Sequence, residues 1–145
     1  MYKMCTNDEF LAPLRSFRRR RLYANLQGDF MVTLGTAAML STDKILELRS
    51  KYKNKLGVVY RSKNNDTNTC DQDQEGPNAV LEMSRSLNKL GWEKVVVNFA
   101  NTLSIPLSHN KICANMKYGE IIGSLLGFSQ GEDVMKDALS FLVSV

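Results

Sequence analysis

The sequence holds one histidine and three cysteines among its 145 residues, which leaves little material for metal or nucleophilic chemistry. The cysteines are Cys5, Cys70 and Cys113, far apart and without the Cys-x-x-Cys spacing of a zinc or redox site. His109 has no cysteine or carboxylate pair near it at ligand spacing, so we expect neither a metal nor a cofactor. The odd number of cysteines favours a reducing compartment.

Long apolar runs are also missing. No segment approaches the roughly 18 residues that a membrane span requires, and the apolar stretch 138–145 is much too short. The first residues lack the basic-then-apolar pattern of a signal peptide. We therefore expect a cytoplasmic protein without a membrane span.

The overall composition is that of a globular protein, with 43% apolar and 23% charged residues. A chain of this length has room for one core, so residues 1–145 should form a single domain. The net charge of +4 is mild, but four arginines follow one another at 18–21. That run suits a solvated helix face, or contact with phosphates or an acidic membrane.

Apolar residues recur at spacings of three and four through most of the chain, a pattern that predicts amphipathic helices. We expect helices near 8–26, 30–40, 43–56, 77–90, 92–103, 112–128 and 132–143. The 92–103 segment has the clearest periodicity and should be the central helix, whereas 57–60 is only a weak strand candidate. Residues 62–76 are polar and should form a flexible loop. The expected fold class is all-α, with about six to eight helices around a central apolar helix.

Catalysis is not expected. A single histidine leaves serine and cysteine without a ready general base, and most carboxylates fall at predicted helix starts or in loops. The sequence contains no phosphate-loop, dinucleotide-binding or zinc-protease motif. We interpret the chain as a binding protein rather than an enzyme.

The segment 87–100, Leu-Asn-Lys-Leu-Gly-Trp-Glu-Lys-Val-Val-Val-Asn-Phe-Ala, resembles the BH1 motif of the Bcl-2 family. Trp92 falls on the tryptophan of the motif, Val95 on its aliphatic pair and Phe99 on its second aromatic residue. Lys94 stands where the motif has arginine, and Glu93 replaces its small glycine. The match therefore covers about fourteen residues, with two departures.

The expected order of helices around this segment is also similar to that of the Bcl-2 family. A BH3-like small residue followed by aspartate occurs at both 41–45, with Asp43, and 27–31, with Asp29, and the sequence leaves the choice open. The BH2 motif is degraded, and only 127–131 stands near its place. Short members with degraded motifs and no tail resemble viral Bcl-2 homologues.

The resemblance implies an inhibitor of apoptosis that holds BH3 helices of pro-apoptotic proteins in a hydrophobic groove. Lys94 would face the aspartate of the ligand. The resemblance implies that the groove is formed by Ile45, Leu48, Tyr52, Leu56, Met83, Leu87, Gly91, Trp92, Val95 and Phe99. It implies no catalytic residue, and it is compatible with a homodimer and with peripheral contact with mitochondria in a host cell.

Two other interpretations remain open. Residues 39–48 and 80–91 resemble the third and fourth helices of a CARD, a death-fold module that assembles by homotypic contacts. A basic helical protein that binds nucleic acid through 18–21 is less favoured, because few aromatic residues interleave the arginines and the total charge is low.

Overall fold

The computed structural model describes residues 1–29, 31–62, 78–99 and 131–144. Within these residues, six helices make up about 55% and three strands about 17%. The helices are α1 (Tyr2–Thr6), α2 (Asp8–Ser16), α3 (Leu34–Ala38), α4 (Thr42–Tyr52), α5 (Asn78–Asn88) and α8 (Glu132–Val143). The strands are β1 (Arg21–Asn25), β2 (Gly57–Arg61) and β3 (Glu93–Asn98). The expected all-α fold is wrong, because the helices surround a mixed sheet.

The three strands form one sheet in the order β1-β3-β2. β1 runs parallel to β3, and Arg21 pairs with Glu93 at the start of their register. β2 runs antiparallel to β3, with an irregularity in the register between Val58 and Tyr60. The weak strand candidate at 57–60 is therefore a strand.

The expected central helix at 92–103 is wrong over its described part, because residues 93–98 are strand β3. Val95, Val96 and Val97 are fully buried, since β3 is the middle strand and both its faces are covered. A run that is apolar on both faces also satisfies helical spacing, so periodicity alone cannot separate the two. β-branched residues favour the strand. Gly91, with φ of 72°, turns the chain from α5 into β3.

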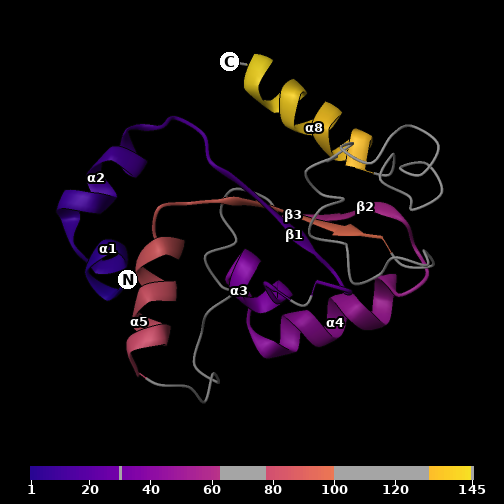
Figure 1. Cartoon of the computed structure of the whole chain (residues 1–145), viewed down its shortest axis with the longest axis horizontal. Coiled ribbons are helices and arrows are strands. Elements are labelled where there is room, and N and C mark those ends of the chain that lie inside the picture. The colour runs from indigo at the N-terminus through magenta and orange to yellow at the C-terminus, as the bar shows by residue number, and fades with distance from the viewer. Residues whose placement is uncertain (30, 63–77, 100–130, 145) are drawn as a thin grey trace.

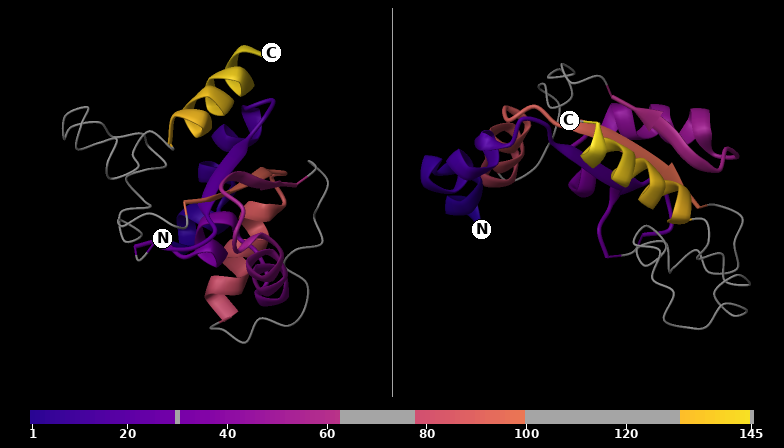
Figure 2. Two further views of the ribbon diagram at one scale, coloured as in Figure 1. Left: turned by 90° about the vertical axis from the view of Figure 1, so that its right-hand side faces the viewer. Right: turned by 90° about the horizontal axis from the view of Figure 1, so that it is seen from above.

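Helices cover both faces of the sheet, as Figures 1 and 2 show. α3 and α4 lie on one face, where Leu34, Leu48 and Val96 belong to one buried cluster. α8 lies on the opposite face, where Val134 packs with Val95, Val97 and Phe99. α1, α2 and α5 gather beside one end of the sheet.

The expected helix 8–26 is wrong beyond Ser16, where α2 ends and the chain extends into β1. Arg20 stabilises this ending, because its Nη1 donates to the carbonyls of Leu14, Arg15 and Phe17 at 3.0, 3.3 and 2.5 Å. Its Nε donates to the Gly91 carbonyl at 3.2 Å. The side chain thus joins the end of α2 to the chain that enters β3.

The buried side chain of Asn98 fixes the end of α4 against the sheet. Its Nδ2 donates to the carbonyls of Tyr52, Lys53 and Lys55 at 3.0, 3.2 and 2.8 Å, which supplies partners for the last helical carbonyl, the C-cap and the turn that follows. At the other end, Ser41 caps α4 by accepting from the Lys44 amide. Both ends of this helix are therefore anchored.

The helices expected near 77–90 and 132–143 are confirmed as α5 and α8. The one expected at 43–56 is confirmed as α4 but ends at Tyr52, and the one expected at 30–40 is shortened to α3. The expected helix 112–128 and the loop 62–76, apart from Ser62, lie outside the described residues. No helix in the described part of the chain is long and apolar enough to cross a membrane.

Candidate binding groove

A groove of about 410 Å³ lies between α1, α3, α4 and α5. We call it the four-helix groove. Its described lining is apolar or carries hydroxyl and thiol groups, and includes no charged side chain. The lining residues are Met1, Cys5, Thr33, Gly35, Thr36, Met39, Leu40, Thr42, Ile45, Val80, Met83, Ser84 and Leu87.

One wall of the four-helix groove is a single face of α5. Val80, Met83, Ser84 and Leu87 are spaced by three and four residues, so they share one side of the helix. α1 packs beside this helix, and the Tyr2 hydroxyl donates a hydrogen bond to the Glu82 carboxylate. The N-terminal residues thereby become part of the groove.

The opposite wall depends on a close approach between α3 and α4. A Cβ atom on Gly35 would lie only 2.9 Å from Ile45 Cδ1, so glycine lets the two helices meet without displacing that side chain. Beyond α3, Met39 adopts a left-handed backbone conformation with φ of 49°. Its carbonyl accepts from Asn88 Nδ2 at 3.2 Å, which connects this wall to α5.

Three of the residues implied by the sequence lie in this groove: Ile45, Met83 and Leu87. They come from α4 and α5, whose apolar stripes were visible in the sequence. The sequence reasoning missed Met1, Met39 and the threonines of the 33–42 segment. No periodic signal marks them, because their place depends on how α1 and α3 pack against the other helices.

The other apolar residues implied by the sequence lie elsewhere. Leu48, Val95 and Phe99 are core residues with exposed fractions of at most 1%. Tyr52, the last residue of α4, is partly buried and packs against the core, and Leu56 is 47% exposed. The indole Nε1 of Trp92 donates to the Leu87 carbonyl at 2.8 Å, and Gly91 forms the turn before β3.

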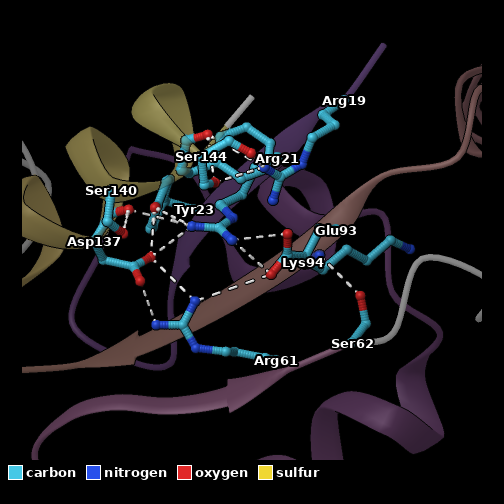
Figure 3. Close-up of polar contacts among 11 residues, drawn as sticks. Arg19, Arg21, Tyr23, Arg61, Ser62, Glu93, Lys94, Asp137, Ser140 and Ser144 are labelled. Atoms are coloured by element: carbon cyan, nitrogen blue, oxygen red, sulfur yellow. Dashed lines mark hydrogen bonds and ion pairs between the residues drawn. The ribbon is translucent and has the colours of Figure 1, made fainter.

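Lys94 lies in the middle strand and is only 3% exposed, although the sequence placed it on the rim of a groove. Its Nζ donates to the Met39 carbonyl at 3.1 Å. Its backbone amide donates to Ser62 Oγ at 2.8 Å, as Figure 3 shows. Because Met39 lines the four-helix groove, the lysine lies behind the groove wall. A ligand in the groove would not meet its ammonium group directly.

Neither candidate BH3-like aspartate contributes to the groove. Asp29 forms a turn, since its Oδ1 accepts from the amides of Met31 and Val32 at 3.0 and 2.9 Å. Asp43 lies in the first turn of α4, where the helix dipole stabilises a negative charge. The BH2-like segment 127–131 lies outside the described residues, apart from Gly131.

A cluster of charged residues connects α8 to all three strands (Figure 3). We call it the α8 docking cluster, formed by Arg21, Tyr23, Arg61, Glu93 and Asp137. Both oxygens of Glu93 accept from Arg21 at 2.8 Å. Asp137 accepts from Arg21 at 2.9 Å, from Arg61 at 2.5 and 3.1 Å, and from Tyr23 at 2.6 Å.

The electrostatics of the α8 docking cluster are balanced, with two arginines and two carboxylates. Burial opposes ionisation of Asp137, but hydrogen bonds from Arg61 and Tyr23 outweigh it and hold the pKa of this carboxyl below its usual value. Burial and the Asp137 carboxylate raise the pKa of the Tyr23 hydroxyl. A neutral, internally paired set of this kind positions a helix rather than offering a reactive group.

Three of the four arginines of the run make contacts within the protein, although Arg18 and Arg19 lie exposed at the surface. Arg20 caps α2 and Arg21 belongs to the α8 docking cluster. Arg19 Nη1 donates to the Ser144 carbonyl at 3.0 Å and to Ser144 Oγ at 2.7 Å, at the end of α8. The run therefore does not form the continuous basic face that nucleic-acid binding requires.

The described residues contain no group of three or more histidine, cysteine, aspartate or glutamate side chains placed to hold a metal ion. No protein-family model matches the chain, and searches of curated proteins and of solved structures gave no match either.

Proposed function

We propose that this protein is a binding module that captures an amphipathic helix of a partner protein in the four-helix groove. The observation that carries the proposal is the meeting of Ile45, Met83 and Leu87 around one apolar groove whose described lining has no charged side chain. Helix-in-groove recognition needs such a lining, because the ligand helix inserts apolar anchors spaced by three and four residues.

The dimensions and lining of the groove support this use. Its volume of about 410 Å³ falls within the range of about 300–1,000 Å³ typical of small-molecule and cofactor pockets. Met1, Met39 and Met83 contribute flexible, polarisable side chains that adapt to differently shaped anchors. The hydroxyl groups of the lining, among them Thr36 and Ser84, offer hydrogen bonds to polar groups of the ligand.

The ligand that we propose is a BH3-type helix of a pro-apoptotic protein, and the resulting activity is inhibition of apoptosis. The local sequence likeness at 87–100 suggests the BH3 class, although its residues 93–98 form strand β3. The structural support comes from the apolar groove. It does not come from a Bcl-2 bundle, because this chain has a mixed sheet where that bundle has its central helix. The lysine-to-aspartate contact is not retained, since Lys94 is buried.

The test is a titration of the full chain with labelled BH3 peptides, with a scrambled peptide as reference. Met83→Glu should weaken binding at least tenfold, because it places a carboxylate in an apolar groove. Leu46→Glu is the matched control, since Leu46 is 59% exposed on α4 and does not line the groove. Circular dichroism of both variants serves to check that they fold like the parent.

The outcomes separate the groove from the ligand class. Equal affinity of the Met83→Glu variant and the parent would show that the groove is not the binding site. If the parent binds no BH3 peptide but binds another amphipathic helix, and Met83→Glu weakens that binding, the groove is the binding site and the proposed BH3 ligand is wrong. If the parent binds no amphipathic helix at all, the proposed function is refuted.

A further inference from the structure

Two segments far apart in the sequence meet at the C-terminal end of α8. Besides its hydrogen bonds to Ser144, the Arg19 guanidinium lies over the Phe141 ring, 4.1 Å from the ring centre. Figure 3 shows Arg19 beside this end of the helix. A hollow of about 480 Å³ opens here, and Phe17, Arg18 and Leu142 are part of its lining.

Large apolar side chains around this hollow are exposed. Phe17 is 60% exposed, Leu139 57%, Leu142 66% and Val143 82%. Leu139, Leu142 and Val143 share one side of α8 by their spacing, and Phe17 lines the same hollow as Leu142. Scattered exposed apolar residues are ordinary, whereas a contiguous group marks an interaction surface. We call this group, with Arg18 and Arg19, the α8 tip patch.

We propose that the α8 tip patch docks on the surface of an anionic lipid bilayer. Apolar side chains of this size enter the boundary between headgroups and acyl chains, while arginine stems extend along them and keep the guanidinium at the phosphates. The strength of such peripheral binding grows with the buried apolar area and with the attraction of basic groups to anionic lipids, and the patch contains both kinds of side chain.

The charge of the patch favours lipid over a second copy of the chain. Arg18 and Arg19 are both exposed. Arg15 nearby pairs with Asp8 at 2.6 Å, so that pair adds no net charge. Two copies related by a twofold axis through the patch would bring four arginines together, which is unfavourable. An anionic bilayer provides the opposite charge, and the local surface potential adds to the attraction.

The patch is separate from the four-helix groove, because α8 and α4 cover opposite faces of the sheet (Figure 2). The inference therefore does not depend on the proposed function. Both surfaces can act at once, with a ligand helix held on a protein that lies on a membrane.

The test is sedimentation of the full chain with vesicles of phosphatidylserine and phosphatidylcholine, compared with phosphatidylcholine alone. We expect binding to the anionic vesicles that weakens as salt is added. Leu142→Glu should reduce vesicle affinity at least tenfold. Arg18→Ala should reduce it about fivefold, because each basic residue near such a surface contributes about 1 kcal/mol. Leu46→Glu is the control, as an equally exposed leucine outside the patch.

Three results would overturn the proposal. The first is equal sedimentation with both kinds of vesicle, or with neither. The second is equal loss of binding for Leu142→Glu and for Leu46→Glu, which would remove the patch as the cause. The third is a concentration-dependent dimer in sedimentation equilibrium that Leu142→Glu abolishes, without vesicle binding, which would make a second copy the occupant.

Discussion

Replacing Asp137 by alanine should loosen α8 from the sheet. Asp137 accepts from Arg21, Arg61 and Tyr23, and its side chain is only 15% exposed. Removing one partner of a buried ion pair typically costs about 3–5 kcal/mol. Arg21 keeps both contacts to Glu93, however, and the Arg61 side chain is 41% exposed. We therefore expect a loss of about 2–3 kcal/mol in the free energy of unfolding.

Urea denaturation gives that free energy, and hydrogen exchange of the α8 amides shows whether the helix opens before the rest of the chain. Asp137→Asn keeps an acceptor for the Tyr23 hydroxyl and should cost less than Asp137→Ala. The control is Asp133→Ala, an exposed carboxylate in the first turn of the same helix, with an expected cost within about 0.5 kcal/mol. If Asp137→Ala and Asp133→Ala are equally stable, the α8 docking cluster does not hold the helix.

Three further predictions concern other parts of the chain. Because hydrogen bonds lower the pKa of Asp137 in the folded protein, the ionised carboxylate should contribute to stability fully above about pH 4. This contribution should disappear as the pH falls through the lowered pKa of the folded protein. The difference in urea midpoint between the parent and Asp137→Asn should therefore shrink toward zero at acidic pH. Lys94→Glu should lower the free energy of unfolding, measured by urea denaturation, by about 3–5 kcal/mol, because it places a carboxylate against the Met39 carbonyl in the core. A loss of less than about 1 kcal/mol would contradict the buried position of Lys94. Gly35→Ala should displace the Ile45 side chain and weaken ligand binding severalfold in peptide titration while thermal unfolding changes little; unchanged affinity would show that this wall is not used.

The sequence predicted those helices that have one apolar face and clear ends. α4 begins after the Ser41 cap, and α5 and α8 each follow one stripe of apolar residues. Of the three strands, only β2 was indicated, as a weak candidate at 57–60. β3 was not predicted, because the run Val95–Val97 is buried on both faces and fits either period. β1 was hidden inside an expected helix, since its parallel partner lies about 70 residues further along the chain.

The candidate groove was predicted only in part, for a related reason. Ile45, Met83 and Leu87 were identifiable because they lie on periodic apolar faces. Met39 has no such signal, and its carbonyl becomes the acceptor for Lys94 only after α3 has packed against β3. From the sequence, Lys94 beside an apolar stripe suggested a position on the exposed rim of a groove. In the structure it is buried, and its ammonium group donates to the Met39 carbonyl.

The position of β3 has a consequence for the order in which the chain folds. β1 and β2 pair with β3 and not with each other, so the middle strand of the sheet is the last of the three along the chain. The Arg21 and Glu93 side chains that pair across the parallel strands are separated by 72 residues. During synthesis, β1 and β2 therefore lack their partner strand until β3 has left the ribosome. Pairing over such a distance is slow, so early folding should be limited to local helices such as α4.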